Sequence, residues 1–548
     1  MRAATGDLWW KNAVVYCLDV ETFADSDGDG CGDFTGLVDR IDYLAGIGVT
    51  CLWLMPFYPT PGHDDGYDVI DFYGVDPGLG TLGDFVVFVR AATDRGIRVI
   101  VDLVVNHTSS QHPWFQQARA DPASPFRDYY VWRDEAPEGP TDLVFPDTET
   151  SNWAHDEVAG QYYLHRFYAH QPDLNISNPA VREEITRIMG FWLQLGVSGF
   201  RVDAVPFLLE VLPEGQPRGS AHDVLVALRA FLSRRRGDAI LLGEVNLEPQ
   251  QVRRFFGEHG EELHMQFSFL TNQALHLSLA RCDDAPLRAL LQRLPEVPAD
   301  CQWANFVRNH DELTLDQLRP EERDDVFAAF GPDPAMQLFG RGLRRRLPSM
   351  VDGDRRRIEL AYSLAFSLPG TPVLLYGEEI GMAENLDIPG RLSVRSPMQW
   401  TAEPGGGFST ADASRLRRPA TEGEFGPEAV NVAAQQTDAD SLLNWMERLI
   451  RRRKETPELG WGSLRLLDTA SPGVLAHRCD WHGGTVVALH NFTPDQREAR
   501  LRLDDGSAEL VDLLSDRRHD VAGNVTVRLE GYGYRWFRVG RPTPDTAR

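Results

Sequence analysis

Short apolar runs alternate along most of the chain with longer segments in which apolar side chains recur at helical spacing. Eight of these runs are rich in β-branched or large apolar residues and have the length of buried strands. They cover residues 13–18, 49–54, 98–104, 199–203, 240–244, 263–267, 303–308 and 372–376. Strands that alternate with helices form parallel sheets, and eight of them can close into a barrel. We therefore predict an α/β protein built on a (β/α)8 TIM barrel.

The segment Ala180–Leu195 illustrates the helical pattern between two of these strands. Its large apolar side chains fall on one helical face, and they are Val181, Ile185, Ile188, Met189 and Trp192. Asn178 can cap the start of this helix, and Pro179 suits its first position. The sequence thus predicts a helix that packs against the barrel.

Two irregular segments interrupt the alternation, and a third region ends it. Residues 108–176 are too long for a connecting loop, which predicts a small inserted domain after the third strand. Residues 382–436 are rich in Gly, Pro and Arg, follow the eighth strand, and are expected over the mouth of the barrel. Short strands with turns between them predict a C-terminal antiparallel β-sandwich domain at residues 456–548. The barrel itself is then expected at residues 1–107 and 177–455.

Charged and imidazole side chains gather at the ends of four predicted strands, at His107, Arg201, Asp203, Glu244, His310 and Asp311. The C-terminal ends of barrel strands form the active site, so the three carboxylates should meet in one cleft. A lone strand-end acid usually makes a structural salt bridge. Three converging acids repel one another, and chemistry explains them better. Two of them about 5–5.5 Å apart would form the nucleophile and the acid of a retaining glycosidase.

The local sequence predicts different tasks for two of these acids. Arg201 lies two residues before Asp203 on the same side of the strand, so its cation should keep Asp203 ionised as a nucleophile. Glu244 follows an apolar run, and this setting should raise its pKa as an acid catalyst requires.

Charge and cysteine content exclude several classes of partner and cofactor. The formal net charge of −26 argues against nucleic acid and anionic membranes, because both require a positive face. The N-terminus shows no apolar signal segment, and no apolar stretch is long enough to span a bilayer. The six cysteines lack any CxxC spacing, so we expect reduced buried thiols, no zinc site and a cytoplasmic protein.

The four strand-end segments resemble the signature regions of the α-amylase superfamily (glycoside hydrolase family 13), and the resemblance covers nearly the whole chain. It implies that Asp203 is the nucleophile, Glu244 the general acid/base and Asp311 the stabiliser of the transition state. Arg201 would orient Asp203, while His107 and His310 would bind sugar hydroxyls. A second group of residues matches exo-acting members. Asp64 and Tyr67 match the pair that holds the non-reducing glucose, and Arg391 matches the arginine that closes its pocket.

Within the superfamily the chain looks most like the trehalose synthases, the maltose–trehalose isomerases. The segments that carry this resemblance are 165–175, 200–208, 301–315, 341–347 and 354–360. Ala204, directly after the expected nucleophile, resembles enzymes that act on α-1,4 and α,α-1,1 bonds. Two loops, Val211–Ser220 and Ala383–Gly390, depart from the pattern of the group. Both are expected on the acceptor side, where an isomerase excludes water and a hydrolase admits it.

Three functions follow from these observations. The first choice is the isomerisation of maltose to trehalose. The alternative is an exo-acting α-glucosidase or glucosyltransferase that uses maltose, trehalose or sucrose. An inactive carbohydrate-binding relative is disfavoured, because all three acids are present. The expected partners are small α-glucosides, no organic cofactor is expected, and homo-oligomerisation stays an open alternative.

A Gly-rich acidic loop follows the first predicted strand. Acids at nearly every second position let a loop wrap oxygen ligands around Ca²⁺, although the loop is not a complete EF-hand. Its resemblance to the calcium loop of many α-amylase relatives implies a structural Ca²⁺ site at Asp25, Asp27, Asp29, Cys31 (through its carbonyl) and Asp33. A second site is expected at the inserted domain, with Asn106 and Asp173 as ligands.

Overall fold

Eight parallel strands close into a barrel in the computed structural model, in the order β1-β14-β10-β9-β8-β7-β3-β2. The strands are β1 (Val15–Leu18), β2 (Cys51–Leu54), β3 (Arg98–Leu103), β7 (Gly199–Val202), β8 (Ile240–Gly243), β9 (Met265–Phe267), β10 (Gln302–Phe306) and β14 (Thr371–Leu375). Six of the eight lie within a run that the hydrophobic pattern predicted, and β10 and β14 each begin one residue before the predicted run. The predicted TIM barrel is confirmed, with strand ends that differ from the prediction by one or two residues.

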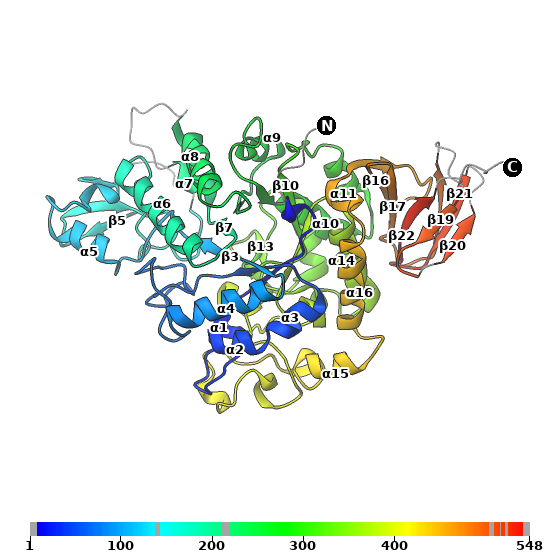
Figure 1. The fold of residues 1–548 in the computed structure, drawn as a ribbon, viewed down its shortest axis with the longest axis horizontal. Coiled ribbons are helices and arrows are strands. Elements are labelled where there is room, and N and C mark those ends of the chain that lie inside the picture. The colour runs from blue at the N-terminus through cyan, green and yellow to red at the C-terminus, as the bar shows by residue number, and fades with distance from the viewer. Residues whose placement is uncertain are drawn as a thin grey trace.

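Helices follow the barrel strands and cover their outer face (Figure 1). They are α1 (Val20–Phe23), α2 (Phe34–Asp39), α3 (Ile41–Ile47), α4 (Leu82–Asp94), α6 (Pro179–Gln194), α7 (Val205–Glu210), α8 (Ser220–Arg235), α9 (Pro249–Val252), α10 (Phe269–Arg281), α11 (Ala285–Leu291), α12 (Pro320–Phe330), α13 (Leu347–Met350), α14 (Arg355–Ser367), α15 (Val432–Thr437), α16 (Leu442–Lys454) and α17 (Glu458–Trp461). Helix α6 begins as predicted, because the Asn178 side chain accepts a hydrogen bond from the Ala180 amide and Pro179 follows it.

The stretch between β3 and α6 projects to one side of the barrel (Figure 1). It contains helix α5 (Pro113–Ala120) and a small sheet ordered β4-β6-β5, formed by β4 (Trp132–Arg133), β5 (Trp153–Asp156) and β6 (Gln161–Leu164). A single bridge from His107 to Asp173 joins the two ends of this stretch, and another from Tyr130 to Leu174 joins its middle to its C-terminal end. A second small sheet follows β10, ordered β11-β13-β12, from β11 (Leu313–Thr314), β12 (Gln337–Leu338) and β13 (Gly342–Leu343).

Antiparallel sheets at the C-terminus form the other end of the molecule (Figure 1). One has six strands in the order β15-β16-β17-β22-β19-β20, and the other pairs β18 with β21. Their bounds are β15 (Ser463–Leu467), β16 (Val474–Trp481), β17 (Gly484–Asn491), β18 (Arg497–Arg502), β19 (Glu509–Asp512), β20 (Arg518–Asp520), β21 (Asn524–Leu529) and β22 (Tyr534–Gly540). Apolar residues of the two sheets share one core, in which Leu489 of β17 and Leu501 of β18 are buried.

Helix α14 lies between the barrel and the six-stranded sheet. It contacts β10 and β14 on one side and β17 and β22 on the other. Its residues from Leu360 to Ser367 are all buried, including the polar Ser363 and Ser367. Ser363 accepts a hydrogen bond from the Trp536 indole and lies 2.9 Å from His490 Nε2, so the sheet is joined to the helix by polar contacts as well as by packing.

The structure describes residues 8–137, 143–210, 220–503, 509–515, 517–520 and 524–540. Within these ranges no helix is long and apolar enough to cross a lipid bilayer. All six cysteines are free thiols, and five of them are buried.

Candidate active site

A cavity of about 330 Å³ opens at the C-terminal ends of the barrel strands. Asp203 follows β7 and Glu244 follows β8, while Asp311 lies in the turn after β10. All three line the cavity, together with Asp64 and Tyr67 from the loop after β2. The strand-end residues that the sequence singled out are thus brought together at one place.

One guanidinium group holds three carboxylates. Arg201 Nη1 donates to Asp203 Oδ1 over 2.5 Å and Nη2 donates to Glu244 Oε2 over 2.5 Å. Arg201 Nη1 also lies 3.3 Å from Asp102 Oδ1, beneath the cavity. Asp203 and Glu244 bind the two ends of one guanidinium, so their carboxylates lie side by side. This arrangement favours the carboxyl separation of about 5–5.5 Å found in retaining glycosidases over the wider separation of inverting ones.

Burial dominates the ionisation of these acids. It raises the pKa of Asp203 to about 6 and that of Asp102 to about 6, against the opposing pull of Arg201. It also raises the pKa of Glu244. The rise at Glu244 agrees with its apolar context in the sequence. The rise at Asp203 was not foreseen, since Arg201 shares its charge among three carboxylates and cannot offset the burial of each one.

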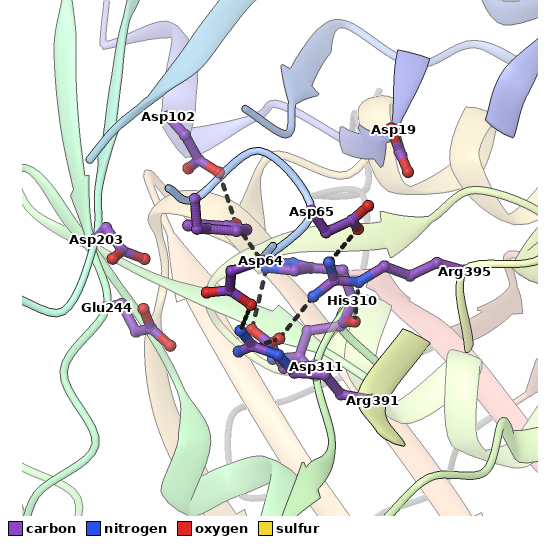
Figure 2. A network of polar contacts seen from close by, with 12 residues as sticks. Asp19, Asp64, Asp65, Asp102, Asp203, Glu244, His310, Asp311, Arg391 and Arg395 are labelled. Atoms are coloured by element: carbon purple, nitrogen blue, oxygen red, sulfur yellow. Dashed lines mark hydrogen bonds and ion pairs between the residues drawn. The ribbon is translucent and has the colours of Figure 1, made fainter. Parts of the chain in front are cut away.

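Asp311 has the opposite environment. Arg391 Nη1 and Arg395 Nη2 donate to its Oδ1 over 3.0 and 2.8 Å, and His310 Nε2 lies 3.1 Å from its Oδ2 (Figure 2). Burial alone would raise the pKa of Asp311, but His310, Arg391 and Arg395 together hold it well below its usual value. Asp311 is therefore an anion at neutral pH, whatever the state of the other two acids.

The end of the cavity near Asp64 is closed by polar contacts. Arg391 Nη2 donates to Asp64 Oδ1, and Gln171 donates to Asp64 Oδ2 over 2.8 Å. The Tyr67 hydroxyl lies 2.7 Å from His310 Nε2 and donates to Asp102. Asp64, Arg391 and Tyr67, which the resemblance assigned to one sugar pocket, thus lie together.

The His107 side chain lines the cavity, and its Nε2 lies 3.0 Å from the Tyr67 carbonyl oxygen. Burial lowers the pKa of His107 to about 4, so its imidazole is neutral near pH 7. A neutral imidazole can exchange hydrogen bonds with a sugar hydroxyl without adding charge to the site.

Aromatic and polar side chains form the rest of the cavity wall. Phe145, Phe167 and Phe207 line it, and the Phe145 ring lies 5.2 Å from the Arg391 guanidinium. Asn246, Asn309, Glu312, Thr314, Asp316 and Arg341 form the polar part of the wall. A wall with apolar and polar parts suits a sugar ring, which has apolar faces and a rim of hydroxyls.

Only one of the two loops that differ from the pattern of the resembled group can be placed in the structure. The loop Val211–Ser220 falls almost entirely outside the described residues. The loop Ala383–Gly390 does not line the cavity, contrary to the expected acceptor-side position. Its last four residues line a separate outer hollow of about 460 Å³, behind Asp64 and Arg391. The physical reason is that Glu384 binds Arg345 and Ser349, which fixes the loop on the far side of Arg391.

The acidic loop after β1 brings three of its aspartates together. One carboxylate oxygen from each of Asp25, Asp27 and Asp29 lies within 4.8 Å of the others. Asp33 is placed differently, because its carboxylate accepts hydrogen bonds from Ser26 and from the Gly36 amide at the start of α2. The donor set of the three clustered aspartates fits a hard cation.

Asn106 and Asp173 meet where the two ends of the inserted stretch join. Both are fully buried, and Asn106 Nδ2 donates to Asp173 Oδ1 over 3.3 Å. Their other oxygens, Asn106 Oδ1 and Asp173 Oδ2, have no hydrogen-bond partner. Two orphaned buried oxygens are the ligand type that Ca²⁺ takes, so this pair also fits a metal.

The sequence alone gave no role to Asp102, Arg395 or Arg341 in this site. Asp102 anchors Arg201, while Arg395 anchors Asp311 and binds Asp65. Arg341 belongs to a basic stretch of the kind that usually covers a solvated surface, yet it lines the cavity and donates to the Val144 carbonyl over 2.5 Å. The Arg391–Ser396 segment carries a second arginine four residues after the first, which was the available signal for Arg395.

Comparison with known proteins agrees with this geometry. The family model described as "Alpha amylase, catalytic domain" matches residues 19–318 and 343–462, and "Sucrose hydrolase-like, C-terminal domain" matches residues 483–538. The trehalose synthase/amylase TreS of Mycobacterium tuberculosis is 42% identical over 550 residues, which cover 97% of this chain and 90% of the relative. The trehalose synthase of Thermus thermophilus is 44% identical over 98% of this chain and 57% of its own length.

Solved structures of related enzymes share the fold. An α-amylase from H. orenii has a TM-score of 0.79 at 27% identity and covers 97% of this chain and 100% of its own. The trehalulose synthase MutB from Pseudomonas mesoacidophila MX-45 has a TM-score of 0.75 at 28% identity and covers 97% of this chain and 99% of its own.

Proposed function

The chain belongs to the α-amylase family, and on this premise we propose that it isomerises maltose to trehalose through a retained α-glucosyl group. Relatives named trehalose synthase are 39–44% identical over nearly all of the chain, which supports this choice. The observation that carries the proposal is the cavity itself. Asp203 and Glu244 lie side by side on Arg201, and the Asp64–Arg391 pair closes the end where a terminal glucose would bind.

The first half of the reaction breaks the bond of maltose. Asp203 attacks the anomeric carbon of the non-reducing glucose, while Glu244 gives its proton to the departing glycosidic oxygen. A covalent glucosyl–Asp203 intermediate forms, and a free glucose remains in the cavity. Asp311, held as an anion, accepts hydrogen bonds from ring hydroxyls that strengthen as positive charge develops on the sugar.

The second half joins the same two sugars differently. The released glucose turns so that its anomeric hydroxyl faces the intermediate, and Glu244 takes the proton of that hydroxyl. The oxygen attacks the anomeric carbon and displaces Asp203, which gives the α,α-1,1 bond of trehalose. Two inversions retain the α configuration. The aromatic wall formed by Phe145, Phe167 and Phe207 supports this step, because it offers apolar surface on which a sugar ring can turn.

The test is to incubate the protein with maltose and follow the anomeric proton signals by NMR. We expect trehalose to accumulate faster than free glucose, and starch to be a poor substrate because one glucose fills the closed end. Free glucose with no trehalose at any time would identify an exo-acting α-glucosidase instead. Rapid internal cleavage of starch would contradict the closed pocket.

The pKa values predict a bell-shaped dependence of kcat/KM on pH. Asp203 must be ionised and Glu244 protonated, so activity should fall as the pH drops below about 6 and should fall again when Glu244 loses its proton. Arg201→Lys keeps the positive charge but cannot bind Asp203 and Glu244 with two separate nitrogens. Burial of Asp203 is then opposed less strongly, so the pKa of Asp203 should rise and the acid limb of the profile should move to higher pH. A profile that stays flat between pH 4.5 and pH 6.5 in the unmodified protein would contradict the assignment.

We propose two calcium sites with a structural role. Asp25, Asp27 and Asp29 would hold one ion, with the Cys31 carbonyl as a further ligand, and Asn106 and Asp173 would hold the other. The orphaned oxygens of Asn106 and Asp173 give the second site its strongest support. A cation held by Asn106 and Asp173 would neutralise the buried Asp173 carboxylate and would tie the inserted stretch to the barrel.

Calcium should then raise the melting temperature of the chelator-treated protein. A ligand that binds the folded state at 100 times its Kd adds about 2.7 kcal/mol of stability. Asp173→Asn and Asp27→Asn should each remove part of the shift, while Asp121→Asn, in an exposed turn, should leave it unchanged. The sites are rejected if neither chelator nor calcium changes the melting temperature.

We also propose a cytoplasmic location, which the free cysteines support. Reduced, unpaired thiols are typical of proteins that remain in that compartment.

A further inference from the structure

Two arginines four residues apart bind a single oxygen atom, and each of them also binds one of two consecutive aspartates. Arg391 and Arg395 both donate to Oδ1 of Asp311, over 3.0 and 2.8 Å. Asp64 binds Arg391, and Asp65 binds Arg395. Figure 2 shows these two arms, each an aspartate–arginine pair that ends at Asp311.

The two arms differ in their access to the substrate. Asp64 and Arg391 line the reaction cavity, and 15% of the Arg391 side chain is exposed. The Arg395 side chain is completely buried, does not line the cavity, and donates a further hydrogen bond to the His310 carbonyl over 2.7 Å. A glucose bound at the closed end would replace contacts of Asp64 and Arg391. It would leave the contacts between Asp65, Arg395 and Asp311 intact.

The pair of Asp65 and Arg395 is held in place by a third arginine, Arg418. Asp65 has a left-handed backbone conformation with φ of 52°, which aspartate adopts more readily than most residues with a side chain. Arg418 donates to the Asp65 carboxylate and to the Arg395 carbonyl, the latter over 3.0 Å. Burial would raise the pKa of Asp65, but Arg418 and Arg395 lower it to about 2, so the carboxylate is charged at neutral pH.

We propose that Arg395 and Asp65 are positioning residues, which hold Asp311 in place while the substrate takes over the contacts of Arg391. The inference rests on the proposed function only in that Asp311 stabilises the transition state. Neither residue touches the sugar. Their effect reaches the reaction through the orientation and charge of Asp311, whose hydrogen bonds to the ring strengthen as the bond breaks.

Such a role predicts a specific kinetic pattern. Arg395→Met removes the buried anchor and should lower kcat for maltose about 100-fold, within the range known for preorganised donors, and change KM less than threefold. Arg395→Lys keeps the charge but cannot reach Asp65, Asp311 and the His310 carbonyl together, so it should recover less than one-tenth of the wild-type kcat. Asp65→Asn leaves Arg395 in place without its carboxylate partner, and it should lower kcat about tenfold.

The decisive measurement compares two kinds of binding. The cationic glucose-ring mimic 1-deoxynojirimycin reports on the charge complementarity of the transition state, and maltose binding to an Asp203→Asn background reports on the ground state. Arg395→Met and Asp65→Asn should weaken the mimic at least tenfold more than they weaken maltose. A purely structural role would weaken both ligands alike.

Arg344→Met is the matched control. Arg344 donates to the Leu386 and Ile388 carbonyls, so it supports the loop before Arg391 without reaching Asp311. It should leave the ratio of the two affinities unchanged. The proposal fails if Arg395→Met, folded by its melting curve, keeps kcat within threefold of wild type. It also fails if both ligands weaken equally in Asp65→Asn. Absence of trehalose from the wild-type reaction would reject the isomerase function alone, because the rate of p-nitrophenyl α-glucoside cleavage would still test the positioning role of Arg395 and Asp65.

Discussion

Asp203→Ala should lower kcat for maltose by at least about 10⁴-fold, the scale seen when a covalent nucleophile is removed. The reason is that no other carboxylate can replace it at the anomeric carbon. Glu244 is committed to the glycosidic oxygen, and Asp311 is held by His310, Arg391 and Arg395. The measurement is the initial rate of maltose loss, with a melting curve to show that the variant is folded.

Azide provides the control that separates a lost nucleophile from a damaged site. With p-nitrophenyl α-glucoside, the space left in Asp203→Ala should admit azide, which attacks the anomeric carbon from the vacated face. The rate should recover in part, and the product should be the β-glucosyl azide. Near wild-type turnover of maltose by the variant, without azide, would exclude Asp203 as the nucleophile.

Glu244→Gln should produce a loss that depends on the leaving group. A general acid contributes about 10²–10⁴-fold, and maltose needs all of it because a sugar alkoxide is a poor leaving group. p-Nitrophenolate leaves without a proton, so the first step on p-nitrophenyl α-glucoside should slow by less than about tenfold. The variant should also lose the alkaline limb of the pH profile, since Gln does not titrate.

The two variants are matched controls for each other. Asp203→Ala should affect maltose and the aryl glucoside alike, because both need the nucleophile. Equal losses on the two substrates in Glu244→Gln would argue that Glu244 is not the acid.

The barrel and its reactive acids could be predicted from the sequence because both signals are local. Each barrel strand is a short apolar run, and Asp203 and Glu244 follow such runs directly. Strand β22 is only weakly marked in the sequence, although it lies inside the six-stranded sheet. Its arginines Arg535 and Arg538 interrupt the apolar alternation, and the fold pairs them with Glu530, just after β21, and with Glu458 of α17.

The remaining features of the site depend on pairings between distant segments. Asp65 meets Arg395 and Arg418, which lie over 300 residues away in the chain, and nothing local marks either contact. The ionisation of Asp203 shows the same limit. A neighbouring arginine predicts a low pKa for Asp203, but the structure adds Asp102 and Glu244 as competitors for that cation, together with the burial of Asp203.

One face of helix α14 is covered by the C-terminal sheet and not by the barrel. Every residue of α14 from Leu360 to Ser367 is buried, because the β17 and β22 strands cover the face that a surface helix would turn to water. Truncation after residue 455 would strip that cover and expose apolar surface together with the hydroxyls of Ser363 and Ser367. A barrel cut off after residue 455 should therefore be less stable than the whole chain, so a shortened version of this protein should retain the C-terminal sheets.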